Sequence, residues 1–111
     1  MNSILNSIKK MLGIEPEDTS YDNELVLHIN SVLGICFQLG VGPKDRPFRI
    51  TGQNEQWSSF IPEDQIETVK DYMFAKVKLI FDPPLNSFTI SLYQDLAKEF
   101  EWRCTVDAET H

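Results

Sequence analysis

The sequence predicts an all-α protein, a small bundle of about four helices with a long irregular loop between the second and third. Apolar residues recur at helical spacing in four segments. Glycine or proline residues interrupt the chain between these segments, while residues 41–60 show no helical period. With 111 residues the chain has room for one hydrophobic core, so we expect a single domain spanning residues 1–111.

The first two helices are expected at residues 3–12 and 22–39. The first carries its apolar residues on one face, and Gly13 follows it as a stop signal. The second has a wide apolar face, which is typical of a helix buried on more than one side. Gly40 and Pro43 mark the end of this second helix.

The third and fourth helices are expected at residues 62–81 and 86–106. Pro62 suits a first helical position, and Pro83 and Pro84 end the third helix because they cannot donate backbone hydrogen bonds. Each helix has one apolar stripe that we expect to face the core. The stripe residues are Ile66, Val69, Met73, Val77 and Ile80 in the third helix, and Phe88, Leu92, Leu96 and Phe100 in the fourth.

The loop at residues 41–60 is long for a small domain, and such loops are often functional. Residues 48–51 alternate in polarity, so they are a candidate short strand or hairpin. Aromatic and apolar side chains in this loop and near the end of the chain are candidates for contacts with another subunit or a partner. These residues are Phe48, Ile50, Trp57, Phe60 and Trp102. The alternative for both tryptophans is that they pack over the ends of the bundle.

Acidic residues outnumber basic ones by 17 to 10, which gives a net charge of −7. This balance argues against tight binding to nucleic acid or to an anionic membrane surface. No stretch approaches the roughly 18 apolar residues that a membrane-spanning helix needs. Residues 1–6 lack a basic region and a long apolar run, so we expect no secretory signal.

No pattern of catalytic, cofactor-binding or metal-binding residues is present, and we do not expect an enzyme. His28 and His111 are the only histidines, and no Cys-x-x-Cys pair occurs. The acids at positions 63, 64, 67 and 71 fit a solvated helix face near a positive dipole end. Cys36 and Cys104 are expected to be reduced thiols in a cytosol, with a disulfide as the alternative in an oxidising compartment.

Several stretches together resemble one family, the small head–tail connector or adaptor proteins of long-tailed bacteriophages and prophages, also described as DNA-packaging proteins. The resemblance rests on the order of its motifs along nearly the whole chain, and each motif is structural. The motifs lie at residues 4–14, 28–32, 38–43, 69–72, 79–84 and 99–103.

This resemblance implies a ring of about a dozen copies beneath the portal, which extends the DNA channel and offers a platform for the neck or tail-completion protein. The expected partners are therefore further copies of the chain, the portal protein and the neck or tail-completion protein. The implied location is the virion neck, after assembly in the bacterial host cytoplasm. The resemblance brings no catalytic residues. A ring would bring Lys44, Arg46 and Arg49 of many copies together, so these are candidate channel-facing residues.

Two other classes of protein remain open from the sequence. One is a small helical regulatory or antitoxin-like protein that binds another protein as a monomer or dimer. The other is a helix-turn-helix DNA-binding protein, which is disfavoured because neither the second nor the third helix offers a basic recognition face.

Overall fold

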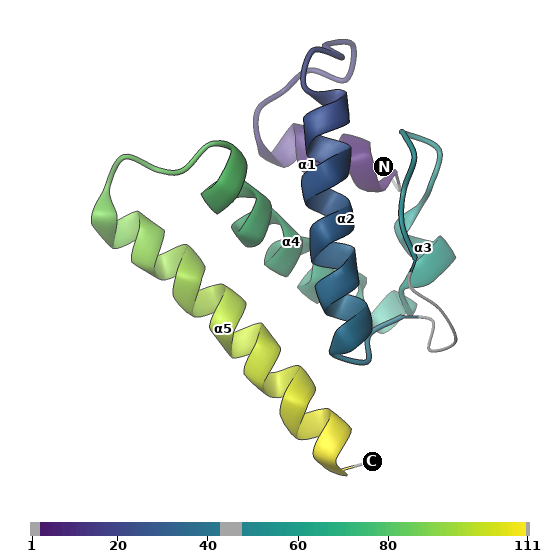
Figure 1. The fold of residues 1–111 in the computed structure, drawn as a ribbon, viewed down its shortest axis with the longest axis vertical. Coiled ribbons are helices and arrows are strands. Elements are labelled where there is room, and N and C mark those ends of the chain that lie inside the picture. The colour runs from purple at the N-terminus through teal and green to yellow at the C-terminus, as the bar shows by residue number, and fades with distance from the viewer. Residues whose placement is uncertain (1–2, 43–47, 111) are drawn as a thin grey trace.

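The computed structural model describes residues 3–42 and 48–110, the last six of them by their backbone alone. Five α-helices follow one another in this part of the chain (Figure 1). They are α1 (Ile4–Met11), α2 (Asp22–Gln38), α3 (Trp57–Phe60), α4 (Ile66–Phe81) and α5 (Ser87–Thr110), with a 3₁₀ turn at Glu63–Gln65 before α4. The predicted all-α class is confirmed. Among the described residues the one β-type pairing is an isolated bridge between Ser3 and Gln56, so residues 48–51 form no strand.

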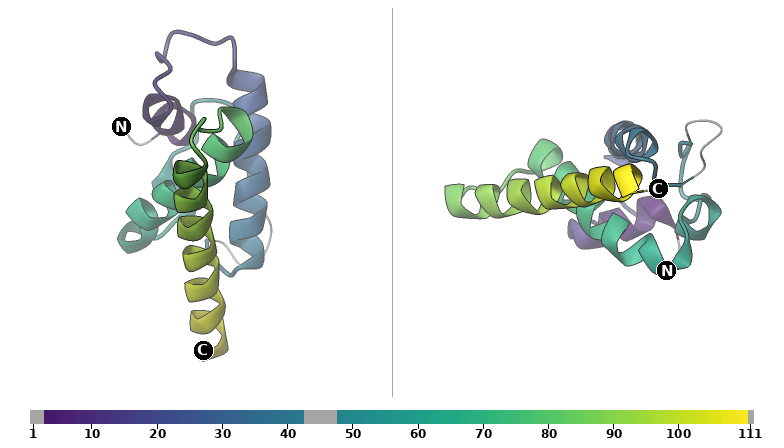
Figure 2. Two further views of the ribbon diagram at one scale, coloured as in Figure 1. Left: turned by 90° about the vertical axis from the view of Figure 1, so that its left-hand side faces the viewer. Right: turned by 90° about the horizontal axis from the view of Figure 1, so that it is seen from below.

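Helix α4 lies at the centre of the bundle. The helices α1 and α2 pack together and against α4, and α5 lies along another side of α4 (Figures 1 and 2). The molecule measures 42 × 35 × 20 Å, so it is flat. In Figure 1, α5 forms the left edge of this flat body, while residues 48–61 and α3 form the right edge.

The core contains most of the positions that the helical stripes predict. Ile29 of α2 and Val69, Met73 and Val77 of α4 are fully buried. Their side chains form one continuous cluster with apolar residues of α1 and of the segment around Trp57. The predicted facing of α2 and α4 is therefore confirmed, although Ile80, at the last turn of α4, is half exposed.

The predicted facing of the last helix is wrong. Leu96, expected in the core, is 51% exposed, and Phe88 and Leu92 also face outward. Phe100, the fourth residue of the predicted stripe, is buried as expected, and the core side of α5 continues through Ala97, with Tyr93 and Cys104 beside them. Apolar residues occupy two opposite faces of this helix, so helical spacing alone cannot select the buried one. Ring packing against α4 selects it, because Phe100 stacks on Tyr72 with centroids 4.3 Å apart.

Helix bounds differ from the predicted ones in three places. Helix α5 continues to Thr110 rather than ending at residue 106. Helix α4 begins at Ile66, because the preceding residues, predicted as its first turn, form the 3₁₀ turn. The loop predicted at residues 41–60 contains α3, a single helical turn. Four residues are too few to show a helical period in a sequence.

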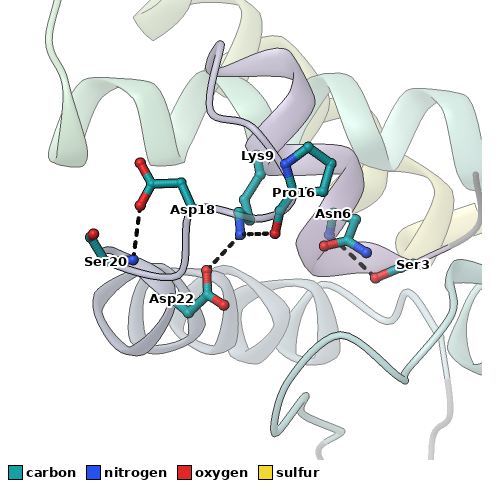
Figure 3. Close-up of polar contacts among 7 residues, drawn as sticks. All are labelled: Ser3, Asn6, Lys9, Pro16, Asp18, Ser20 and Asp22. Atoms are coloured by element: carbon teal, nitrogen blue, oxygen red, sulfur yellow. Dashed lines mark hydrogen bonds and ion pairs between the residues drawn. The ribbon is translucent and has the colours of Figure 1, made fainter.

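A buried ion pair fixes the connection between α1 and α2. The Lys9 side chain is 1% exposed, and its Nζ lies 2.9 Å from Oδ1 of Asp22 in the first turn of α2 (Figure 3). The same ammonium donates to the carbonyl oxygen of Pro16 at 3.0 Å. One cation thus joins the end of α1, the following loop and the start of α2. The Asp22 carboxylate also suits the positive dipole end of α2.

Candidate assembly surface

The segment at residues 48–61 is held against its own helices by side-chain hydrogen bonds. The Asn30 side chain of α2 accepts from the Ile50 amide at 2.7 Å and donates to the Ile50 carbonyl at 3.0 Å. The buried Trp57 indole donates to the Ser7 hydroxyl of α1 at 3.1 Å. These bonds satisfy backbone and indole groups that would be costly to bury unpaired. The segment is therefore part of the subunit's own core.

The turn within this segment is closed by Glu55. Its carboxylate accepts from the Thr51 amide and hydroxyl, at 3.0 and 2.8 Å, and from the Gly52 amide. Slight burial opposes ionisation, but these hydrogen bonds outweigh it and lower the pKa of Glu55 below its ordinary value. The Glu55 carbonyl also accepts from the Ile4 amide at 3.0 Å, which joins the turn to the start of α1.

The five residues that the sequence singles out as contact candidates fall into two groups. Phe48, Ile50 and Trp57 are buried in the subunit, and Trp57 belongs to its core cluster. Their side chains stabilise the fold. The contact role of the five residues stays a prediction, and Phe60 and Trp102 are the two that leave side-chain surface for it. Phe60 is partly buried and stacks on Phe48 at 4.8 Å, whereas Trp102 is 65% exposed on α5.

The structure describes one of the three candidate channel-facing residues. Arg49 is exposed, while Lys44 and Arg46 lie outside the described residues. The lysines of α4 lie beside acids. These ion pairs are Lys70 with Glu67 at 3.5 Å, Lys76 with Glu101 at 3.7 Å and Lys78 with Asp82 at 2.8 Å. Their charge is locally balanced, so α4 presents no unbalanced basic face.

Five of the nine large hydrophobic side chains that are exposed in the described residues lie on α5 or just before it. Phe88 is 70% exposed, and Leu92 and Leu96 follow at intervals of four residues, so the three form one ridge. Leu85 precedes this ridge fully exposed, and Trp102 extends the apolar surface toward the C-terminal end. We call these five side chains the α5 face. Soluble monomers rarely expose contiguous apolar patches of more than a few hundred Å², and larger patches mark interaction sites.

Two buried titratable groups lie where α2, α4 and α5 meet. Burial, with Cys104 nearby, raises the pKa of the Cys36 thiol to about 12, so this thiol is neutral at neutral pH. Burial and the 2.7 Å hydrogen bond that Tyr72 donates to Glu101 raise the pKa of Tyr72 well above its ordinary value. A neutral buried thiol is a poor nucleophile, so Cys36 acts as a core residue.

Concave and chemically reactive features are sparse in the described part of the chain. A cleft of about 250 Å³ between α4 and α5 is lined by Lys76, Leu79, Gln94, Ala97, Lys98 and Glu101. Residues 3–42 and 48–110 hold no group of His, Cys, Asp or Glu side chains that could bind a metal ion. Within the same ranges no helix is long and apolar enough to cross a membrane. The exposed apolar side chains of the α5 face make it a candidate contact surface.

The family described as phage connector protein matches residues 4–111, which is almost the full chain. The chain belongs to this family. No curated protein and no solved structure matches it. The connector is therefore a structural component of a phage particle, of a type that contacts other head or tail proteins at the neck.

The sequence did not single out most of the connector's α5 face. Trp102 was a contact candidate, but Phe88, Leu92 and Leu96 were assigned to the core, although the signal was present in the fourth helix. A helix with apolar residues on two faces is stable when both faces are covered. The core of one chain covers one of these faces, so the other is left for a contact outside the subunit.

Proposed function

We propose that the connector forms a closed ring of about a dozen copies beneath the portal, as a head–tail adaptor. The ring extends the DNA channel and gives the neck or tail-completion protein a surface to attach to. The observation that carries this proposal is the family match over residues 4–111. The α5 face supports it, because a ring subunit must cover an apolar surface against its neighbours.

The partners in this proposal are further copies of the chain, the portal protein and the neck or tail-completion protein. Assembly takes place in the host cytoplasm, and the finished ring stays in the virion neck. The net charge of −7 supports a channel in which DNA slides without sticking, because a polyanion is repelled by an acidic wall. Lys44, Arg46 and Arg49 face this channel in the proposed ring, where repetition around a circle adds to their weak individual attraction.

Removal of the gene from its phage tests this function. Without the connector, head and tail assembly should proceed separately, so electron microscopy of lysates should show tailless heads and free tails. A plasmid carrying the wild-type gene should restore tailed, infectious particles, and the same plasmid with an early stop codon should not. Normal numbers of tailed particles in the deletion strain would contradict the proposal and favour a regulatory protein.

A further inference from the structure

Helix α2 has one side that the subunit leaves uncovered. Its core side packs on α1 and α4 (Figure 2). By helical spacing, Leu27, Ser31 and Gly34 lie on the opposite side. Leu27 is 66% exposed, and a Cβ on Gly34 would meet no atom within 4 Å. From Ile29 to Gln38 the helix carries no charged residue, on either side. We call Leu27, Ser31 and Gly34, with the partly buried Ile35 at their flank, the α2 outer row.

The α2 outer row lowers the stability of an isolated subunit. A glycine within a helix costs about 0.5–1 kcal/mol relative to alanine, and no neighbouring atom in the subunit requires Gly34. Surface helices usually carry charged residues on the solvent side, which the last ten residues of α2 lack. An uncharged row of small side chains with an exposed leucine is the surface on which another helix packs closely.

Resting on the ring proposed above, we propose that the α5 face of one copy packs across the α2 outer row of the next copy. The ridge of Phe88, Leu92 and Leu96 would lie over Ser31 and Gly34, where small side chains let the two helix axes approach. Both rows repeat at intervals of four residues, which is the spacing of the commonest class of helix packing. The occupant of the α5 face is thus a second copy of this chain.

The exposed area suits such a contact. Phe88 and Trp102 alone expose on the order of 300 Å², because an aromatic side chain presents 150–250 Å². Three leucines of the α5 face add roughly as much again, and a standard interface buries about 800 Å² per partner. The α5 face with its polar flanks is therefore one side of an ordinary stable interface.

Charge argues for two different surfaces rather than a symmetric pair of α5 helices. Asp95 lies exposed between Leu92 and Leu96, and Glu99 follows one turn later. A symmetric α5 pair would bring the Asp95 carboxylates of both copies into one contact, and like charges repel. The uncharged end of α2 carries no such penalty. A contact between two different faces also propagates from copy to copy, as a ring requires.

Disulfide crosslinking between two variants, each with one introduced exposed cysteine beside the buried Cys36, tests the contact. Leu92→Cys and Ser31→Cys, each made in the full chain with Cys104→Ala, are mixed at high concentration and oxidised. Leu92 is 48% exposed and Ser31 is also exposed, so each variant should fold. We expect a covalent dimer that contains one copy of each variant. The control mixture of Leu92→Cys with Thr68→Cys, an exposed position on α4, should give none.

Gly34→Gln in the Ser31→Cys chain provides a second measurement. The open space around Gly34 lets the subunit fold with circular dichroism and melting temperature like the parent or better. The longer side chain should nevertheless abolish the crosslink to Leu92→Cys. Homodimers of Leu92→Cys alone, equal yields with the Thr68 control, or no crosslink at all would each overturn the contact. Tailless heads after gene deletion together with a failed crosslink would leave the adaptor function standing and reject only this interface.

Discussion

Leu96 and Ala97 are neighbours on α5 in opposite environments. Leu96 is 51% exposed on the outward face, while Ala97 is 4% exposed against α4. Leu96→Glu should therefore change the free energy of unfolding by less than about 1 kcal/mol. Ala97→Glu places a charge in the core and should lower the free energy of unfolding by about 3 kcal/mol. Urea unfolding followed by circular dichroism measures both, and equal losses would show that α5 faces the other way.

Position 42 requires a glycine for two reasons, its backbone conformation and the close approach of Phe48. Its φ is +89°, and an added Cβ would lie 2.6 Å from Cε1 of Phe48. Gly42→Ala should cost about 1–3 kcal/mol, through strain and displacement of the Phe48 ring. Gly52→Ala is the matched control, because the space around Gly52 is open and its φ is not in the left-handed region. A similar stability for both variants would contradict the tight packing at Gly42.

At the level of elements, the connection between α1 and α2 depends on one ion pair of unequal partners. Lys9 is fully buried, whereas Asp22 is partly exposed at a helix start that favours acids. Asp22→Ala leaves a buried ammonium with the Pro16 carbonyl as its remaining acceptor, and we expect a loss of about 2 kcal/mol. This is less than the 3–5 kcal/mol typical of breaking a fully buried pair.

The reverse change should be milder. Lys9→Met keeps the apolar stem and removes the buried charge, and the Asp22 carboxylate that remains is partly exposed at a helix start that favours acids. Its loss should be about 1 kcal/mol or less in the same unfolding experiment, with Lys10→Met, an exposed neighbour, as the control. A larger loss for Lys9→Met than for Asp22→Ala would contradict this order.

The sequence predicts the buried side of a helix well where the helix has a single apolar stripe. In α4, Val69, Met73 and Val77 leave one possible buried side, and the structure agrees. In α5 two apolar sides compete, and the choice depends on ring stacking between Phe100 and Tyr72, which helical spacing does not encode. The buried place of Trp57 depends on a hydrogen bond to Ser7, fifty residues earlier in the chain. Contacts of this kind become visible only in three dimensions.

For the whole molecule, charge predicts weak attraction to DNA. Lysines of α4 lie beside acids, and the net charge is −7. Binding of the isolated chain to a random duplex should be weaker than the roughly 10⁻⁴ to 10⁻⁶ M of non-specific DNA-binding proteins at physiological salt. Fluorescence anisotropy with a labelled duplex measures this. Micromolar affinity with a steep salt dependence would favour a DNA-binding protein over a passive channel.

The flat subunit, with apolar surfaces on two different helices, is suited to repeat around an axis. Electron cryomicroscopy of the neck in purified phage particles tests this most directly. We expect a closed ring between the portal and the tail, into which the five helices of the described residues fit once per subunit, with α5 of each copy against α2 of the next. A neck that lacks the chain, or a chain present without cyclic repetition, would contradict the assignment of this protein as a ring-forming adaptor.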